Sequence, residues 1–297
     1  MILLTSLAPT LLIGNSYTAR NDLAGVVAGL YAAAGVADSP ESLTADGLTW
    51  AGHVERIEGG APGWSDALAV ARPRVILQEQ SQIPGFPADH PEWIASLEAA
   101  RTLHGLAGGA ETWLFVTWGR RDGDRDNPDI YPDFPTMNDR LEAGYLAVAA
   151  DLPAHVAPVG RGWRVVWDDA SAAGEDPLAP GSRFDRLYSE DGSHPSTLGT
   201  LLAACVIVTS TTGTPCADLP APGVDPADAA WVADAADRAV LGSTDLVFPW
   251  TADPPADTDE APVDPGESAD TGCGCAHAPA PAWWLAGAAA LIARRRR

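Results

Sequence analysis

The stretch LLIGNSYTARNDL, residues 11–23, decides the fold. An apolar run ends at Gly14-Asn15-Ser16, and a helical pattern begins directly after it. This order predicts a buried strand, a tight turn and a helix, with Ser16 at the carboxyl edge of a parallel sheet, where α/β proteins bind ligands. Two interpretations of Ser16 are open at this point. It is either a nucleophile beside backbone N–H groups that can hold an oxyanion, or a helix cap.

Short apolar runs continue to alternate with helical patterns as far as residue 215, which is typical of βαβ units. We predict strands at 10–14, 74–79, 112–117 and 155–159, and a weaker strand at 53–58. We predict helices at 18–34, 91–106, 135–151, 196–211 and 226–241. The pattern therefore predicts one α/β domain with a parallel sheet over residues 1–250.

The composition excludes some classes of partner. The chain has 297 residues, of which 46% are hydrophobic, so it can bury a core. It carries 40 acidic and 18 basic residues, a net charge of −22, and every basic residue is Arg. Such a surface repels phosphate backbones, so we do not expect a nucleic-acid partner. Cys205 and Cys216 are interpreted as two buried thiols in preference to a disulfide formed in an oxidising compartment.

The composition changes after Trp250. Residues 251–272 are acidic and rich in Pro, which predicts a disordered linker. Residues 273–297 hold a Cys pair, an apolar segment and four terminal Arg residues, which favours a short membrane segment with its end in the cytoplasm. At the other end, MILLTSLA is apolar without a basic region, so an export signal is either short or missing from this chain.

Two segments supply partners for a serine nucleophile. In DGSHPS, residues 191–196, Asp191 precedes His194 at a spacing that lets its carboxylate orient the imidazole. The alternative is that Asp191 and the serines cap the helix that follows. In EGGAPG, residues 58–63, the glycines Gly59, Gly60 and Gly63 suit a backbone N–H aimed into a cleft.

Polar residues also follow the predicted strand at 74–79 and the one at 112–117. The run Gln78-Glu79-Gln80-Ser81-Gln82 offers side-chain amides that can donate to an oxyanion. The loop at 117–134 holds Trp118, Arg120 and Tyr131, which are candidates to contact a sugar or an acyl group. The alternative for this loop is an ordered segment whose Arg and Asp residues pair with one another. Its Asp spacing lacks the pattern of a calcium loop, and we predict no metal there.

Taken in order, these blocks resemble the SGNH hydrolase superfamily, also called GDSL-like esterases. LLIGNSYT is similar to the first block, with Ser16 as nucleophile, and DGSHPS to the last, with Asp191 and His194. GGAPG resembles the second block, in which we choose Gly60 over its neighbours as the oxyanion N–H. The third block departs from the family: Gln78-Glu79-Gln80-Ser81 stands where most members have Gly-x-Asn-Asp, so Gln80 takes the place of the Asn.

The resemblance implies a three-layer, flavodoxin-like sandwich with a five-stranded parallel sheet and no metal or cofactor. It implies that Ser16 attacks an ester carbonyl, His194 relays protons, and Asp191 orients His194. The N–H groups of Ser16 and Gly60 and the Gln80 amide would stabilise the oxyanion. The expected function is a serine esterase acting on small-molecule or polysaccharide esters, with O-acetyl groups as one candidate. The alternative is a non-catalytic surface module that binds glycans in the same crevice.

The carboxyl-terminal segment DTGCGC…WWLAGAAALIARRRR resembles the tripartite tag processed by myxosortase-type systems, with Cys273 as the processing position. This resemblance implies export and anchoring at the cell surface. It also implies two partners: the membrane, through the terminal segment before processing, and a sorting protease.

Overall fold

One parallel sheet of five strands runs through the part of the chain that the structure describes. The computed structural model describes residues 8–251. The strand bounds are β1 Leu11–Gly14, β2 Glu41–Thr44, β3 Arg74–Leu77, β4 Glu111–Phe115 and β5 Ala154–Ala157. The strands lie in the order β2-β1-β3-β4-β5, and every neighbouring pair is parallel. The predicted three-layer α/β architecture is therefore confirmed.

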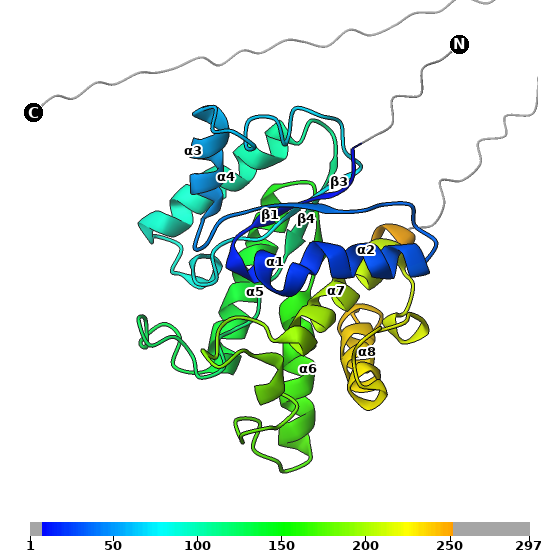
Figure 1. Cartoon of the computed structure of the whole chain (residues 1–297). Helices are drawn as coiled ribbons and strands as arrows, with labels where there is room; N and C mark the ends of the chain where they lie inside the picture. The colour runs from blue at the N-terminus through cyan, green and yellow to red at the C-terminus, as the bar shows by residue number, and fades with distance from the viewer. Residues whose placement is uncertain (1–7, 252–297) are drawn as a thin grey trace, which may run out of the picture. The chain divides into compact units, whose positions relative to one another are not determined.

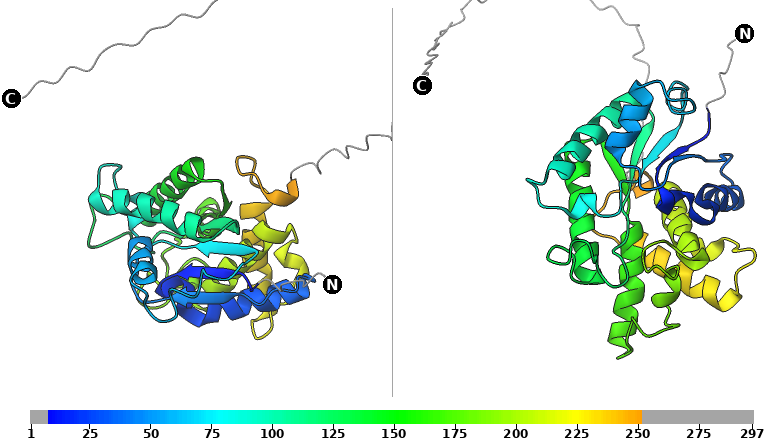
Figure 2. Two further views of the ribbon diagram at one scale, coloured as in Figure 1. Left: turned by 90° about the horizontal axis from the view of Figure 1, so that it is seen from above. Right: turned by 60° about the vertical axis from the view of Figure 1, so that its left-hand side comes forward.

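Helices cover both faces of this sheet because successive side chains of each buried strand point to opposite sides (Figures 1 and 2). The helix bounds are α1 Ser16–Ala19, α2 Leu23–Ala33, α3 Trp50–Glu58, α4 Pro91–Leu106, α5 Phe134–Asp151, α6 Val159–Ala172, α7 Thr197–Thr212 and α8 Pro226–Val240. Leu12 of β1 packs in a cluster with α2, α6, α7 and α8, whereas Leu11 and Ile13 pack in a second cluster with α3, α4 and α5.

The strand predicted at 53–58 is wrong. That segment belongs to the helix α3, which is capped by the Thr49 side chain and buries Trp50 and His53. The fifth strand is instead β2, at the edge of the sheet, and in it only Leu43 is buried. An edge strand with one buried side chain carries no apolar run, so the sequence pattern did not reveal it.

The helix α6 was also absent from the predicted elements. Its first turn contains Gly160 and Gly162, which weaken a helical pattern. Packing explains both glycines. A Cβ at Gly160 would lie 2.6 Å from the Thr117 carbonyl oxygen, and one at Gly162 would lie 3.0 Å from Leu202. The glycines therefore let α6 approach the end of β4 and α7 closely.

The predicted helix at 18–34 is divided in two. Asn21 and Asp22 have positive φ values of 52° and 54°, so α1 ends and a one-turn 3₁₀ segment, Arg20–Asp22, leads into α2. The Asp22 side chain then caps α2 by accepting from Gly25 N–H. This break leaves Arg20 at the end of the short helix that begins with Ser16.

Cys205 and Cys216 form a disulfide, with their Cα atoms 5.4 Å apart. The preference for two buried thiols is therefore wrong. The bond joins the buried helix α7 to the turn that begins at Cys216, and both residues are buried in the same cluster. The predicted burial of the two residues is confirmed, and the fold brings their sulfur atoms together.

The predicted linker at 251–272, apart from Thr251, and the segment at 273–297 lie outside the described residues. So do Cys273 and the first seven residues of the chain. Between residues 8 and 251, no helix has the length and apolar character that crossing a membrane requires.

Candidate active site

The turn at Gly14-Asn15-Ser16 joins β1 to α1 at the carboxyl edge of the sheet (Figure 1). Asn15, rather than Ser16, is the cap of α1, and its Oδ1 accepts a hydrogen bond from Tyr17 N–H at 3.1 Å. The Ser16 hydroxyl is therefore not engaged in capping. As the first helical residue, Ser16 also has a backbone N–H with no acceptor inside its own helix.

Gln78, directly after β3, holds this turn. Its Oε1 accepts from the Asn15 N–H at 2.9 Å and from the Thr18 hydroxyl at 2.9 Å. A glycine is needed at the start of the turn because a Cβ at Gly14 would lie 2.4 Å from both Gln78 Oε1 and Thr18 Oγ1. The backbone of Ser16 is thus positioned by a side chain from the neighbouring strand.

His194 lies against Ser16, with its Nε2 2.7 Å from Ser16 Oγ. Its Nδ1 is 2.6 Å from Asp191 Oδ2. The other carboxylate oxygen of Asp191 accepts the backbone N–H groups of Ser193 and His194, each at 2.9 Å. Burial alone would raise the pKa of Asp191, but these hydrogen bonds outweigh it and lower that pKa below its usual value. Asp191 is therefore an ionised acceptor that fixes the imidazole.

Asp191 does not cap the helix that follows it, which was the alternative interpretation. The cap of α7 is Ser196, whose hydroxyl accepts from Gly199 N–H. The segment before it is a tight turn in which Ser189 N–H donates to the His194 carbonyl at 2.8 Å. Gly192 supports the turn with a φ of 66°. Asp191 thus stabilises the turn that presents His194, and it does not serve the helix.

A pocket of about 320 Å³ opens at Ser16. Its walls come from the loops after β1, β2, β3 and β4 and from the turn before α7, and they include Ser16, Arg20, Gly47, Gln80, Arg120 and His194. Because parallel strands end at one edge of the sheet, these loops meet there although they are far apart in the sequence.

Gly60 does not lie on this pocket, so the choice of Gly60 is corrected. It follows the end of α3, and its N–H donates to the Ile57 carbonyl at 3.1 Å. The glycine that lines the pocket is Gly47, in the loop between β2 and α3, with a φ of 64°. Sequence reasoning missed it because β2 was not recognised. The Asp46-Gly47 turn signal was the feature that could have indicated it.

Gln80 does line the pocket, and its amide is oriented by Gln82. Its Oε1 accepts from Gln82 N–H at 2.8 Å, and its Nε2 donates one hydrogen to Gln82 Oε1 at 3.0 Å. A primary amide has two N–H hydrogens. The second hydrogen of Gln80 Nε2 is left for a group inside the pocket.

Glu79, between Gln78 and Gln80, does not line the pocket and is fully buried. Its carboxyl accepts from Trp50 N–H at 2.9 Å and from the Ser96 hydroxyl at 2.6 Å. Burial raises the pKa of Glu79 to about 7. The three polar residues after β3 therefore have different roles. Gln78 holds the Ser16 turn, Glu79 connects the end of the strand to α3 and α4, and Gln80 faces the pocket.

Trp118 and Tyr131 do not face the pocket, and their predicted contact with substrate is corrected. Trp118 is 0% exposed and stacks between Tyr17 and Trp163, with ring centroids 4.7 Å and 4.1 Å away. Its Nε1 donates to the Ser193 carbonyl at 3.1 Å, which supports the turn before His194. Tyr131 is also 0% exposed. Polar residues surround both aromatics in the sequence, so their burial was visible only in the fold.

Arg120, in contrast, lines the pocket, and its contact with substrate stays a prediction. Two arginines of this loop pair with aspartates inside it, Arg120 with Asp124 at 2.5 Å and Arg121 with Asp122 at 3.0 Å, and Arg121 also pairs with Asp185 outside it at 2.7 Å. Between residues 8 and 251 no group of three or more His, Cys, Asp or Glu side chains is placed to hold a metal ion.

His53 is a buried residue beside the site that the sequence did not single out. Its Nε2 lies 2.8 Å from the Gly14 carbonyl, and its Nδ1 accepts from Trp64 Nε1 at 3.1 Å. This pattern assigns the hydrogen of the neutral ring to Nε2. Burial lowers the pKa of His53 to about 4. A neutral His53 therefore supports the backbone directly before Ser16.

We expect this buried imidazole to make stability depend on pH. As the pH falls from about 6.5 to about 4, the unfolded chain binds a proton at His53 before the folded protein does, so the free energy of unfolding decreases. His53→Gln keeps a donor to Gly14 but does not titrate. Between about pH 7 and about pH 4.5, urea unfolding of the wild type should lose about 2–3 kcal/mol more than His53→Gln. Glu79 also titrates in this range, but it is present in both proteins, so its effect cancels in the comparison. Equal decreases in the free energy of unfolding for the two proteins would contradict the prediction.

Comparisons with known proteins agree with this architecture. No protein-family model and no curated protein sequence matches the chain. A solved structure of a DUF4886 family protein from Bacteroides uniformis is 18% identical, with a TM-score of 0.65, covering 82% of this chain and 99% of the other. A candidate SGNH hydrolase from Slackia heliotrinireducens is 24% identical, with a TM-score of 0.51, covering 68% of this chain and 98% of the other. The chain therefore has the fold of the SGNH hydrolases.

Proposed function

We propose that this protein is a serine esterase. The observation that carries the proposal is the line of hydrogen bonds from Ser16 Oγ to His194 Nε2, at 2.7 Å, and from His194 Nδ1 to Asp191, at 2.6 Å, at a pocket open to substrate. A hydroxyl, an imidazole and an ionised carboxylate in this geometry are the parts that nucleophilic acyl transfer requires.

The proposed reaction has two steps. Ser16 Oγ attacks the ester carbonyl carbon while His194 Nε2 takes its proton, and the ionised Asp191 stabilises the resulting imidazolium. His194 then gives this proton to the departing alcohol, which leaves an acyl group on Ser16. Water attacks that acyl group with His194 again as the base, and the carboxylic acid and free Ser16 are released.

Three donors are proposed to hold the oxyanion: the backbone N–H of Ser16, the backbone N–H of Gly47 and the free hydrogen of Gln80 Nε2. Gly47 replaces Gly60 in this role because it lies on the pocket and, within residues 8–251, its N–H has no hydrogen-bond acceptor. Neutral donors oriented before the reaction stabilise the charge that develops on the carbonyl oxygen.

The acyl group is proposed to be small, with acetyl as the best candidate and a sugar as the alcohol. Gly47, Gln80 and Ser81 lie in the lining beside Ser16, together with the aromatic residues Tyr17 and His194, and no aliphatic side chain is among the lining residues. A long acyl chain would find no aliphatic side chain to pack against. An open pocket of this kind suits an acetyl group carried on a larger hydroxylated molecule.

A panel of chromogenic esters of increasing acyl length tests this proposal. We expect kcat/KM to be highest for acetyl and to fall at least about tenfold by octanoyl, because the added methylenes stay in water. A preference for octanoyl would contradict the small acyl group. Absence of turnover on every ester, with retained binding of acetylated sugars, would favour the glycan-binding alternative.

We further propose that the protein is exported and anchored at the cell surface through its terminal segment, with Cys273 as the processing position. The disulfide between Cys205 and Cys216 supports export, since such bonds persist mainly in oxidising compartments. In the native host, Cys273→Ser should accumulate as the longer, unprocessed form. Cys275→Ser is the matched control and should mature normally. Normal maturation of Cys273→Ser would contradict the sorting proposal.

A further inference from the structure

Arg20 stands out among the arginines of this acidic chain. The chain has 40 acidic residues to 18 basic ones, and most of the arginines in the described part lie within 4.0 Å of a carboxylate. Arg56 and Arg183 lie over tryptophan rings instead. Within residues 8–251, Arg20, Arg125 and Arg140 have neither kind of partner, and of these three only Arg20 lines the Ser16 pocket, where it is exposed. An unpaired cation is thus presented to whatever enters.

Arg120 is a second cation on the same pocket, and it is held rigidly. Its Nη1 donates to Asp124, which is 2% exposed and also accepts from Asn127 Nδ2 at 2.9 Å and from Gln82 Nε2 at 2.5 Å. Asp124 therefore orients the guanidinium. The Nε–H of Arg120 is buried without a hydrogen-bond partner in the described part of the chain. A buried donor without an acceptor costs free energy, so the cation is held in place by Asp124 and not by a bond from Nε.

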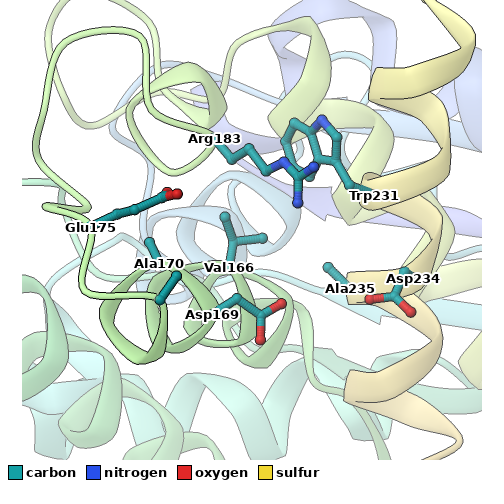
Figure 3. A pocket seen from close by; sticks show the side chains of 9 residues that line it. Val166, Asp169, Ala170, Glu175, Arg183, Trp231, Asp234 and Ala235 are labelled. Atoms are coloured by element: carbon teal, nitrogen blue, oxygen red, sulfur yellow. The ribbon is translucent and has the colours of Figure 1, made fainter.

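The charge of this pocket is opposite to that of another hollow on the same protein. A hollow of about 290 Å³ between α6 and α8 is lined by three carboxylates and one arginine, Arg183, which lies over the Trp231 ring (Figure 3). The Ser16 pocket has Arg20 and Arg120 in its lining and a single carboxylate, Asp46. Asp124 offsets part of the Arg120 charge from behind the lining, so Arg20 is the cation of this pocket that no carboxylate pairs with in the described part of the chain. On a chain with a net charge of −22, such a lining favours an anion locally.

We propose that the ester bound at Ser16 carries a carboxylate on its alcohol part, and that Arg20 and Arg120 bind this carboxylate. The planar guanidinium presents paired N–H donors that match a carboxylate, and such charge-assisted pairs are stronger than neutral hydrogen bonds. The charge belongs on the alcohol because the acyl group in the proposed function is acetyl, which carries none. Asp46 is then an acceptor for the hydroxyl groups of an acidic sugar. This inference rests on the proposed esterase function for its substrate class.

A matched pair of substrates tests it: the monoacetate of methyl glucuronoside and that of methyl glucoside, which differ at one carboxylate. The wild type should have a kcat/KM at least about tenfold higher for the glucuronoside. Arg20→Gln and Arg120→Gln should each reduce the ratio of the two kcat/KM values, glucuronoside over glucoside, severalfold. Arg125→Gln is the matched control, because Arg125 is exposed in the same loop as Arg120 but does not line the pocket, and it should keep the ratio.

If the wild-type kcat/KM for the glucuronoside were no higher than that for the glucoside, the inference would be overturned and the esterase proposal would stand. A binding measurement distinguishes the failure of one proposal from the failure of the other. Calorimetry with Ser16→Ala should detect tighter binding of methyl glucuronoside than of methyl glucoside, and Arg20→Gln in that background should remove the difference. If no ester were hydrolysed and this binding preference were found, the esterase function would fail and the carboxylate site would stand. Equal binding of the two sugars would overturn the carboxylate site.

Discussion

Ser16→Ala is expected to lower kcat for an acetyl ester by at least about a thousandfold, the largest effect of any single substitution in this protein. Within residues 8–251, Ser16 Oγ is the nucleophilic atom placed against His194 Nε2, and alanine has no atom to replace it. KM should change little, because the residual pocket still binds the ester. Initial rates with an acetyl ester, at substrate concentrations on both sides of KM, measure both quantities.

The fold of Ser16→Ala should be intact, since Asn15 and not Ser16 caps α1. Thermal unfolding of both proteins checks this. Ser193→Ala is the matched serine control: its hydroxyl, 2.6 Å from the Tyr17 hydroxyl, lies beside His194 but makes no bond to its ring. It should lose less than about tenfold in kcat. A Ser16→Ala protein with wild-type turnover would end the assignment of Ser16 as nucleophile.

Asp191→Asn is expected to lower kcat by about a thousandfold, the second-largest effect. The asparagine oxygen can still accept the backbone N–H groups of Ser193 and His194, so the turn should persist. Its amide, however, donates where the carboxylate accepted. His194 would then carry its proton on Nε2, the atom that must take the proton of Ser16. The expected loss of kcat therefore comes from the wrong tautomer of His194, with little change in structure.

Glu190→Gln is the matched control for Asp191→Asn. It removes the charge of the adjacent, exposed carboxylate and should leave kcat within about twofold of the wild type. Comparing the two variants separates the specific contact with His194 from a general loss of negative charge. A loss in Asp191→Asn of less than about tenfold would show that Asp191 does not orient the base.

Those parts of the fold that depend on local pattern were predictable. β1, β3, β4 and β5 are buried runs flanked by turns, and their predicted positions agree with the structure to within a few residues. The helices α4, α5, α7 and α8 carry clear start signals, as Asp225 before Pro226 illustrates. Burial on both faces of a sheet makes a strand apolar throughout, so its own residues reveal it.

The candidate site was only partly predictable, because its members depend on contacts with distant parts of the chain. Gly47 follows an edge strand that has almost no apolar signal, whereas Gly60 belongs to a more visible glycine cluster at a helix end. Trp118 was a candidate for sugar contact because polar residues surround it, yet it stacks in the core on Tyr17 and Trp163. Exposure is a property of the packed molecule and not of a residue's sequence neighbours.

The sequence by itself determined the strand, turn and helix that present Ser16, and it determined the Asp191–His194 spacing, because each arises from residues close together in the chain. The tertiary structure decided that Asn15 caps the helix, that Gly47 lines the pocket and that Cys205 bonds to Cys216. It also decided that Gln78 and His53 hold the turn before Ser16. These contacts join separate strands and helices, and they exist only when the parallel sheet brings the strand ends to one edge.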